Sequence, residues 1–303
     1  MTTRIPEPNK RFCCFLSWVA LLLCTAIPTS AVAQQNSKNK KDAVVARPLL
    51  KQTITRNESQ RFGYGGTVSI VGAPVGSITI ESWQRDEVAV SANVELQAES
   101  EDDLRRLAAL NTFVFDQDAN HIRVVTTGTH DKQFMKRAAK DFPKKLLGLP
   151  WKIDFRIRVP SSTDLEIDAG RGPISVVGVE GALRISASET ETKLMLAGGT
   201  VTATIGVGKV DLLVPSRSWR GNGVQLRLAA GSVTAEFPVG FSGDIDAQIL
   251  RTGSIEDNFG ALQARERPGI TPQTVKARAG AGGAYFQFIV GDGMVYLKKR
   301  TND

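Results

Sequence analysis

The feature that most constrains the fold of this chain is a short repeat between residues 172 and 212. Each unit begins with glycine and places apolar residues two and four positions later, as in Gly172-x-Ile174-x-Val176. The units begin at residues 172, 181, 190, 199 and 208, a constant step of nine, with Thr190 in the place of a glycine. A fixed period indicates units that need a neighbour to bury their apolar faces, so we expect stacked β-strands.

The repeat also predicts which side chains face the core. Glycine is expected at the corners between strands, where positive φ or close backbone approach excludes a Cβ atom. The apolar residues that follow then line a narrow interior. A charge at Ile174, Val201 or Val210 should therefore damage the fold far more than one at Ser175 or Thr202.

The first 33 of the 303 residues have the order of a secretory signal peptide. Basic residues precede an apolar run from 12 to 27, and Ala31-Val32-Ala33 supplies the expected cleavage site. A retained anchor and a lipoprotein anchor at Cys24 are the alternatives, but a membrane-spanning helix needs roughly 20 apolar residues. All three cysteines lie in this segment, so the mature chain should contain no disulfide or cysteine ligand.

The remaining chain is expected to have two parts. Residues 34–62 are polar, lack a hydrophobic period and predict a disordered tether. Residues 63–300 predict one β-repeat domain, divided into strands with a helix (63–129), a basic insertion (130–152) and solenoid repeats (153–300). Ser100 with Asp103 marks the start of the helix, whose apolar face begins at Leu104. The expected fold is therefore all-β, a solenoid-like stack of short strands with one short helix.

The basic insertion reads HDKQFMKRAAKDFPKKLLGLPWK and holds seven Lys or Arg residues against two Asp residues. One interpretation is a basic amphipathic element that contacts an anionic leaflet or polymer. The other, which we favour, is a solvated helix and loop whose apolar side caps the end of the β-stack. The candidate contact residues are Lys136, Arg137, Lys140, Lys144, Lys145 and Trp151.

Several segments resemble the bacterial putative-adhesin family, also called the toastrack domain. The resemblance rests on GSITIESWQRDEVAVSANVE, NTFVFDQDANHIRVVT, IRVPSSTDLEIDAGRGPISVVGVEGALRIS, LAAGSVTAEF and GDGMVYLKK, in that order, between residues 65 and 299. It implies a right-handed, largely single-stack β-solenoid outside the cytoplasm, with no established enzymatic residues. The basic insertion departs from the family pattern.

Candidate catalytic residues are few. Asp164, Glu166 and Asp168 share one strand face and could serve a carbohydrate-active enzyme, which needs a pair of carboxylates. The favoured alternative pairs them with Arg156 and Arg158 on a neighbouring strand. Asp244 and Asp246 form a similar, weaker pair of carboxylates on one face.

The sequence gives little support for metal or cofactor chemistry. The two histidines, His121 and His130, lie beside a turn and in a polar loop, where surface positions are expected. We predict no cofactor, no metal ligand and no catalytic residue. Nucleic acid is not expected as a partner, because basic and acidic residues alternate outside the insertion.

These observations predict an exported, non-catalytic module for binding or scaffolding in the periplasm or at the cell surface. The expected partners are an envelope polymer, an anionic membrane surface or an envelope protein, in keeping with the net charge of +7. Two alternatives remain open: an envelope-stress sensor that acts through a partner protein, and a solenoid carbohydrate-active enzyme.

Overall fold

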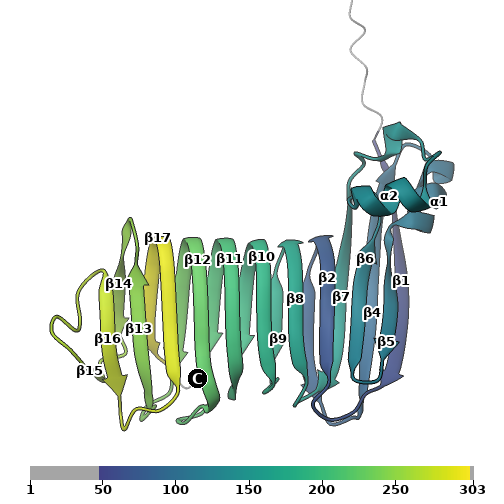
Figure 1. Cartoon of the computed structure of the whole chain (residues 1–303). Helices are drawn as coiled ribbons and strands as arrows, with labels where there is room; N and C mark the ends of the chain where they lie inside the picture. The colour runs from purple at the N-terminus through teal and green to yellow at the C-terminus, as the bar shows by residue number, and fades with distance from the viewer. Residues whose placement is uncertain (1–47, 301–303) are drawn as a thin grey trace, which may run out of the picture. The chain divides into compact units, whose positions relative to one another are not determined.

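The computed structural model describes residues 48–300. The expected signal peptide and residues 34–47 of the expected tether lie outside this part of the chain. The described residues form an all-β fold in which hydrogen bonding joins seventeen strands (Figure 1). The strands are β1 (Leu50–Arg61), β2 (Thr67–Val75), β3 (Ile78–Trp83), β4 (Glu87–Ala98), β5 (Thr112–Asp118), β6 (His121–Thr127), β7 (Trp151–Pro160), β8 (Asp164–Arg171), β9 (Ile174–Val177), β10 (Ala182–Met195), β11 (Gly198–Leu213), β12 (Arg220–Phe237), β13 (Gly243–Ile249), β14 (Gly253–Asn258), β15 (Leu262–Ala264), β16 (Thr274–Ala279) and β17 (Tyr285–Lys299).

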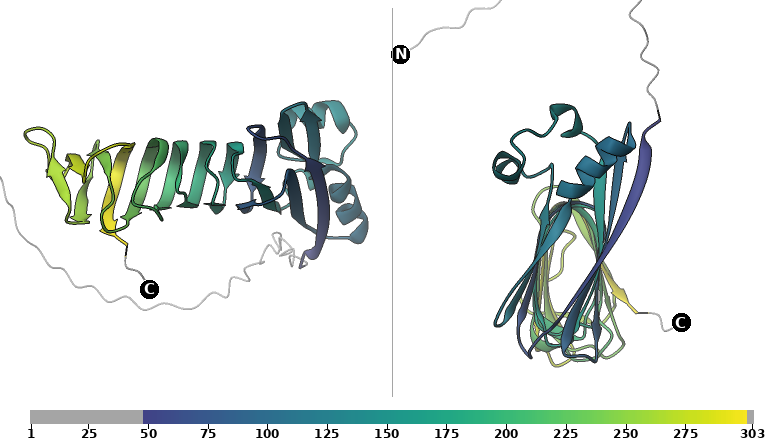
Figure 2. Two further views of the ribbon diagram at one scale, coloured as in Figure 1. Left: turned by 90° about the horizontal axis from the view of Figure 1, so that it is seen from below. Right: turned by 90° about the vertical axis from the view of Figure 1, so that its right-hand side faces the viewer.

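The nine-residue period is half of one structural rung. In the register of β8, β10 and β11, Leu183 lies between Leu165 and Val201, so equivalent positions are 18 residues apart. One unit lies in a first sheet and the next in a second sheet behind it, and Figure 2 shows the two layers in the view along the stack. The expected stacking is therefore confirmed, and the structure shows that the stacked strands are parallel.

The strands of the central rungs are longer than expected, because they continue through the corners. Strands β10, β11, β12 and β17 contain 14, 16, 18 and 15 residues. At the corners of β11 and β12, Gly208 and Gly231 have φ of 143° and 135°. A Cβ at Gly231 would overlap the carbonyl oxygen of Gly208, so glycine lets a strand bend between the sheets without losing its neighbours.

Thr190 occupies this corner in β10, in register with Gly208. Its side chain is buried, and its hydroxyl oxygen lies 3.3 Å from that of Thr192. The two hydroxyls satisfy each other inside the otherwise apolar interior. This corner is therefore built around a buried side chain rather than a glycine.

The order of strands departs from the order of the chain at both ends. The first sheet runs β5, β6, β2, β8, β10, β11, β12, β17, β13, β16 and β15. The second sheet runs β1, β4, β7, β3, β9, β10, β11, β12, β17 and β14. The last strand, β17, thus inserts between β12 and the β13–β14 pair (Figure 1).

The core fills the narrow space between the two sheets. Side chains alternate along each strand, so that Val201 and Val210 of β11 are 1% and 0% exposed whereas Thr202 is exposed. An aromatic cluster packs near the C-terminal end of the stack, with ring centroids 4.6–5.7 Å apart. Its members are Trp219, Phe237, Phe241, Phe259 and Phe286.

The prediction of a disordered tether was wrong for residues 50–61. They form β1, which pairs antiparallel with β4 from Leu50 opposite Ala98 to Arg61 opposite Glu87. Most of its side chains are exposed on both faces, so the strand carries no apolar alternation that a sequence pattern could reveal. Backbone hydrogen bonds to the edge of β4 hold it instead.

The predicted helix is confirmed as α1 (Glu101–Leu110), where the side chain of Ser100 accepts a hydrogen bond from the Asp103 N–H at 3.2 Å. The helix and loop favoured for the basic insertion are also found. A second helix, α2 (Lys132–Ala138), and a 3₁₀ turn, η1 (Lys144–Leu146), lie inside the basic insertion. In Figure 1 both α-helices lie beyond the same ends of strands β4 to β7.

Candidate functional site

The basic insertion replaces the corner of one rung. Strand β6 pairs with β2 in the first sheet and β7 pairs with β3 in the second, so residues 128–150 join the sheets where other rungs use a glycine. A Cβ at the next corner, Gly76, would overlap the carbonyl oxygen of Ile153 in β7. The insertion therefore projects from the edge of a rigid stack.

The insertion is ordered by local capping. The carboxylate of Asp131 accepts hydrogen bonds from the backbone N–H groups of Gln133 and Phe134 at 2.8 and 3.0 Å. These hydrogen bonds hold the pKa of Asp131 below its usual value, and the bond from Phe134 has the largest effect. The loop before the helix is also fixed, because Thr129 N–H donates to Asn111 Oδ1 at 2.8 Å. The Asp131 carboxylate and the loop at Thr129 therefore stabilise the start of α2.

The apolar residues of the insertion pack toward the body of the protein. Met135 and Leu146 are buried, and Phe142 and Leu149 are packed against the main core. Trp151 also packs against the core, with its ring centroid 5.3 Å from that of His130. The favoured interpretation of an inward apolar side agrees with this packing, and Trp151 is half-buried rather than a projecting contact residue.

Four of the candidate cations remain free on the outside. Lys136, Arg137, Lys140 and Lys144 are exposed, and none forms an ion pair with another residue between 48 and 300. Lys132, which precedes them on α2, is exposed and unpaired in the same way. These five residues, called the basic cluster below, concentrate positive charge on one projecting segment.

The remaining basic residues of the insertion have structural partners. Lys145 Nζ lies 2.9 Å from Asp103 Oδ2 of α1, and this contact lowers the pKa of Asp103. Lys152 lies 3.1 Å from Asp154. Lys145 is therefore better described as a tie between the insertion and α1 than as a ligand contact.

His130 adds no charge to the basic cluster near neutral pH. Burial lowers its pKa, outweighing the neighbouring carboxylate of Asp131. The imidazole is thus neutral near pH 7 and packs as an aromatic ring against Trp151.

The acidic ladder lies on the first sheet, where its partners differ from those expected. Arg156 and Arg158 belong to β7 in the second sheet, so their predicted pairing with Asp164, Glu166 and Asp168 is wrong. Glu166 Oε1 instead lies 3.3 Å from Arg184 of β10. Asp164 Oδ1 accepts the Ala182 backbone N–H at 2.6 Å.

Glu166 also belongs to a cluster that the sequence did not reveal. Ser69 Oγ donates to Glu166 Oε2 at 3.0 Å and lies 2.7 Å from His121 Nε2. In a hydrolytic triad the histidine lies between the serine and the acid, whereas here the serine lies between the other two. Ser69 is only 3% exposed, so the cluster has the geometry of a polar link between strands.

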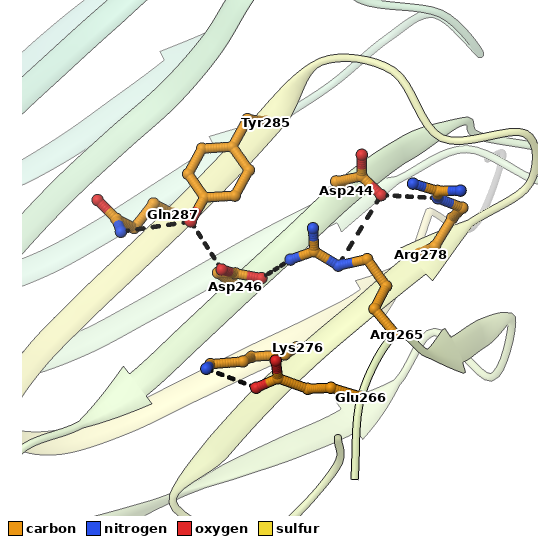
Figure 3. Close-up of polar contacts among 8 residues, drawn as sticks. All are labelled: Asp244, Asp246, Arg265, Glu266, Lys276, Arg278, Tyr285 and Gln287. Carbon is orange, nitrogen blue, oxygen red and sulfur yellow. Dashed lines mark hydrogen bonds and ion pairs between the residues drawn. The ribbon is translucent and has the colours of Figure 1, made fainter. Parts of the chain in front are cut away.

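Asp244 and Asp246 form part of a neutralised network at the C-terminal end of the first sheet. Asp244 accepts a hydrogen bond from Arg278 at 2.9 Å, and Asp246 accepts one from the Tyr285 hydroxyl at 2.7 Å. Arg265 contacts both carboxylates, as Figure 3 shows. Burial is the main cause that raises the pKa of Tyr285 to about 12, so the phenol remains a donor.

This network does not suit glycosidase chemistry. A general acid needs a carboxyl group with a raised pKa. The Arg278 hydrogen bond instead holds the pKa of Asp244 below its usual value. The arrangement ties β13, β16 and β17 together at the end of the stack (Figure 3).

The lowered pKa of Asp244 predicts a pH-dependent contribution to stability. A carboxylate with a depressed pKa in the folded state stabilises the fold above its unfolded pKa of about 3.9 and loses that effect as the pH falls through the folded value. Urea unfolding should therefore show Asp244→Asn less stable than the wild type near pH 7, with a smaller difference near pH 3. Asp141→Asn, at an exposed residue, is the control, and a constant difference for Asp244→Asn would contradict the prediction.

Two further observations concern the described part of the chain. Between residues 48 and 300 no group of three or more His, Cys, Asp or Glu side chains could hold a metal ion. In the same range, no helix is both long enough and apolar enough to cross a membrane.

No protein-family model and no curated protein matches the chain. Among solved structures, a putative cell adhesion protein from Clostridium sporogenes is similar over 82% of this chain and 100% of its own, with 13% identity and a TM-score of 0.42. A putative adhesin from Bacteroides fragilis is similar over 82% of this chain and 97% of its own, with 12% identity and a TM-score of 0.31. A putative lipid binding protein from Parabacteroides distasonis is similar over 82% of this chain and 97% of its own, with 10% identity and a TM-score of 0.22.

Proposed function

We propose that this chain is an exported, non-catalytic binding module that attaches to an anionic polymer or membrane surface of the cell envelope. The basic cluster is the contact, and the β-stack is the rigid support that presents it. The observation that carries the proposal is the exposure of five cations on one projecting segment, none of which forms an ion pair with a residue between 48 and 300. They are Lys132, Lys136, Arg137, Lys140 and Lys144. Export rests on the signal-like order of residues 1–33.

The packing of the insertion indicates how it would bind. Its buried apolar residues, Met135 and Leu146, are committed to the protein interior, and few apolar side chains remain outside. Leu147 is an exception, with 41% exposure. Attachment would therefore depend on charge rather than on insertion of a hydrophobic face, and salt would weaken it.

The test is cosedimentation of the purified full chain with isolated envelope polymer and, separately, with anionic vesicles across a salt series. The variant K132Q/K136Q/R137Q/K140Q/K144Q removes the basic cluster. Because each Lys or Arg near an anionic membrane contributes about 1 kcal/mol, the variant should bind anionic vesicles at least about 100-fold more weakly. A similar loss is expected on the polymer if that is the natural surface.

A control variant carries the same loss of charge at other exposed positions. R61Q/R217Q/R227Q/R267Q/K299Q changes five cations that have no ion pair within residues 48–300. This control should retain binding. Equal weakening in both variants, or no binding of the wild type to either surface, would overturn the proposal.

A further inference from the structure

A hollow on the outer face of the second sheet has the features of a separate binding site. It lies where β1, β4 and β7 are neighbours and has a volume of about 340 Å³. Its middle strand, β4, lines the hollow with the small outward side chains of Ala89 and Ser91. Asn57, Glu58 and Ser59 of β1 lie on one side, and Arg156 and Arg158 of β7 lie on the other. The Glu58 carboxylate is paired with Arg56 at 2.8 Å.

The register explains why the hollow exists. Ser91 lies opposite both Asn57 and Arg156, and Ala89 lies opposite Ser59. The long side chains of Arg156 and Arg158 therefore border a strip of small side chains on one side. The volume falls within the range of about 300–1,000 Å³ that small-molecule sites occupy.

The two arginines of the hollow are neighbours on one strand, unpaired within the described part of the chain. Arg184, Arg251 and Arg278, which also lie on or beside the sheets, each contact a carboxylate. Arg156 and Arg158 are both exposed, lie two residues apart on one face, and form no ion pair with any residue between 48 and 300. Glu81 of β3 lies opposite Arg158 in the register but forms no ion pair with it. Two adjacent guanidinium groups repel each other, and together they favour an anion.

An aromatic side chain fixes one of these arginines. The Arg158 guanidinium lies over the ring of Trp83, with its Cζ atom 5.6 Å from the ring centroid. Trp83 is itself held by a hydrogen bond from its Nε1 to the Glu87 carbonyl oxygen at 2.9 Å. Arg158 is therefore positioned before any ligand arrives, which reduces the entropy lost on binding.

We propose that this hollow binds an acidic saccharide unit, one that carries a carboxylate or phosphate group. Arg156 and Arg158 would hold the oxyanion by charge-assisted hydrogen bonds, for which the planar guanidinium is well suited. The hydroxyl and amide groups of Asn57, Ser59 and Ser91 would bind the sugar hydroxyls. The site is independent of the basic cluster, because the two share no residue.

The first experiment measures binding of the full chain to three probes by calorimetry: a short oligogalacturonate, glucose 6-phosphate and a neutral maltooligosaccharide. We expect binding of at least one acidic probe and none of the neutral one. The comparison of the two acidic probes distinguishes a carboxylate from a phosphate as the preferred group. No binding of either acidic probe, or equal binding of the neutral one, would overturn the proposal.

Variants then locate the site. R156Q/R158Q should weaken binding of the acidic probe at least tenfold, whereas R217Q/R227Q, which loses the same charge at two exposed unpaired arginines, should not. Ser91→Phe should also weaken binding, because it fills the hollow and leaves both arginines in place. Thermal unfolding checks that each variant is folded. Equal loss in both double variants would show nonspecific attraction and contradict the site.

The variant of the basic cluster separates this proposal from the proposed function. It should bind the acidic probe as the wild type does, while R156Q/R158Q should still sediment with the anionic surface. Loss of probe binding on removal of the basic cluster would place the saccharide there and overturn the hollow as its site.

Discussion

Replacing Gly231 by alanine is expected to unfold the protein or to lower its free energy of unfolding by about 3 kcal/mol or more. Gly231 has a φ of 135°, which L-residues rarely adopt. The added Cβ would also meet the carbonyl oxygen of Gly208 in the next rung. Relief would require the rungs to separate, and their backbone hydrogen bonds would then weaken.

Urea unfolding followed by circular dichroism measures this effect. Gly148→Ala is the matched control, because no atom lies within 4 Å of its added Cβ and its φ is not in the positive region. The control should be as stable as the wild type. If Gly231→Ala matched the control, the corners would not require glycine.

The second large effect is expected for Val210→Asp. Val210 is fully buried between the two sheets, and the neighbours in its register are Thr192 and Val233. A carboxylate there would lose its hydration without gaining a partner, so we expect a loss of about 4 kcal/mol or more, or failure to fold.

The comparison with Thr202→Asp makes the measurement specific. Thr202 lies on the same strand, β11, but its side chain faces solvent. Its free energy of unfolding in urea should change little, and Val210→Ala should give an intermediate loss because it only removes buried apolar surface. Similar stability for Val210→Asp and Thr202→Asp would contradict the assignment of inward and outward faces.

The sequence predicted the nine-residue unit, which is half of a rung, but not the order of the rungs. The nine-residue step identifies each unit because glycine and apolar residues recur at fixed positions. It does not identify neighbours, because Gly208, Gly231 and Gly293 carry nearly the same local pattern. The placement of β17 beside β12 depends on contacts between residues far apart in the chain, such as Val233 and Val295.

The partners of β1 and of the acidic ladder were also not predicted, because they too depend on contacts between segments far apart in the chain. Strand β1 has no apolar period, because it lies outside β4 and buries little of its surface. The sequence favours pairing of the acidic ladder with Arg156 and Arg158, because these arginines lie on the strand just before it. Turns between the two sheets instead bring Glu166 beside Arg184, one full rung later.

The candidate binding surfaces differ in how far they could be predicted. Exposure of Lys136 and Lys140 follows from their charge, whereas the half-buried position of Trp151 depends on its contact with His130. The hollow beside Arg156 was not predicted. The sequence feature that indicates the hollow is the small size of Ala89 and Ser91. This feature can be interpreted only when β4 is known to lie beside β7.

The structure also bears on the enzymatic alternative. Asp244 and Asp246 are held by arginine and tyrosine contacts, and Glu166 is held by Arg184 and Ser69. The Arg278 hydrogen bond holds the pKa of Asp244 below its usual value, whereas the general acid of a glycosidase needs a raised pKa. The proposed recognition of a surface rests instead on the exposed cations and on the stack of rungs that carries them.

The most direct test of this account is hydrogen exchange of the full chain with and without the anionic envelope polymer, analysed by mass spectrometry. The account predicts slower exchange in residues 132–147, which contain the basic cluster, with little change in the central strands β10 and β11. Binding that leaves exchange in residues 132–147 unchanged would contradict the basic cluster as the contact.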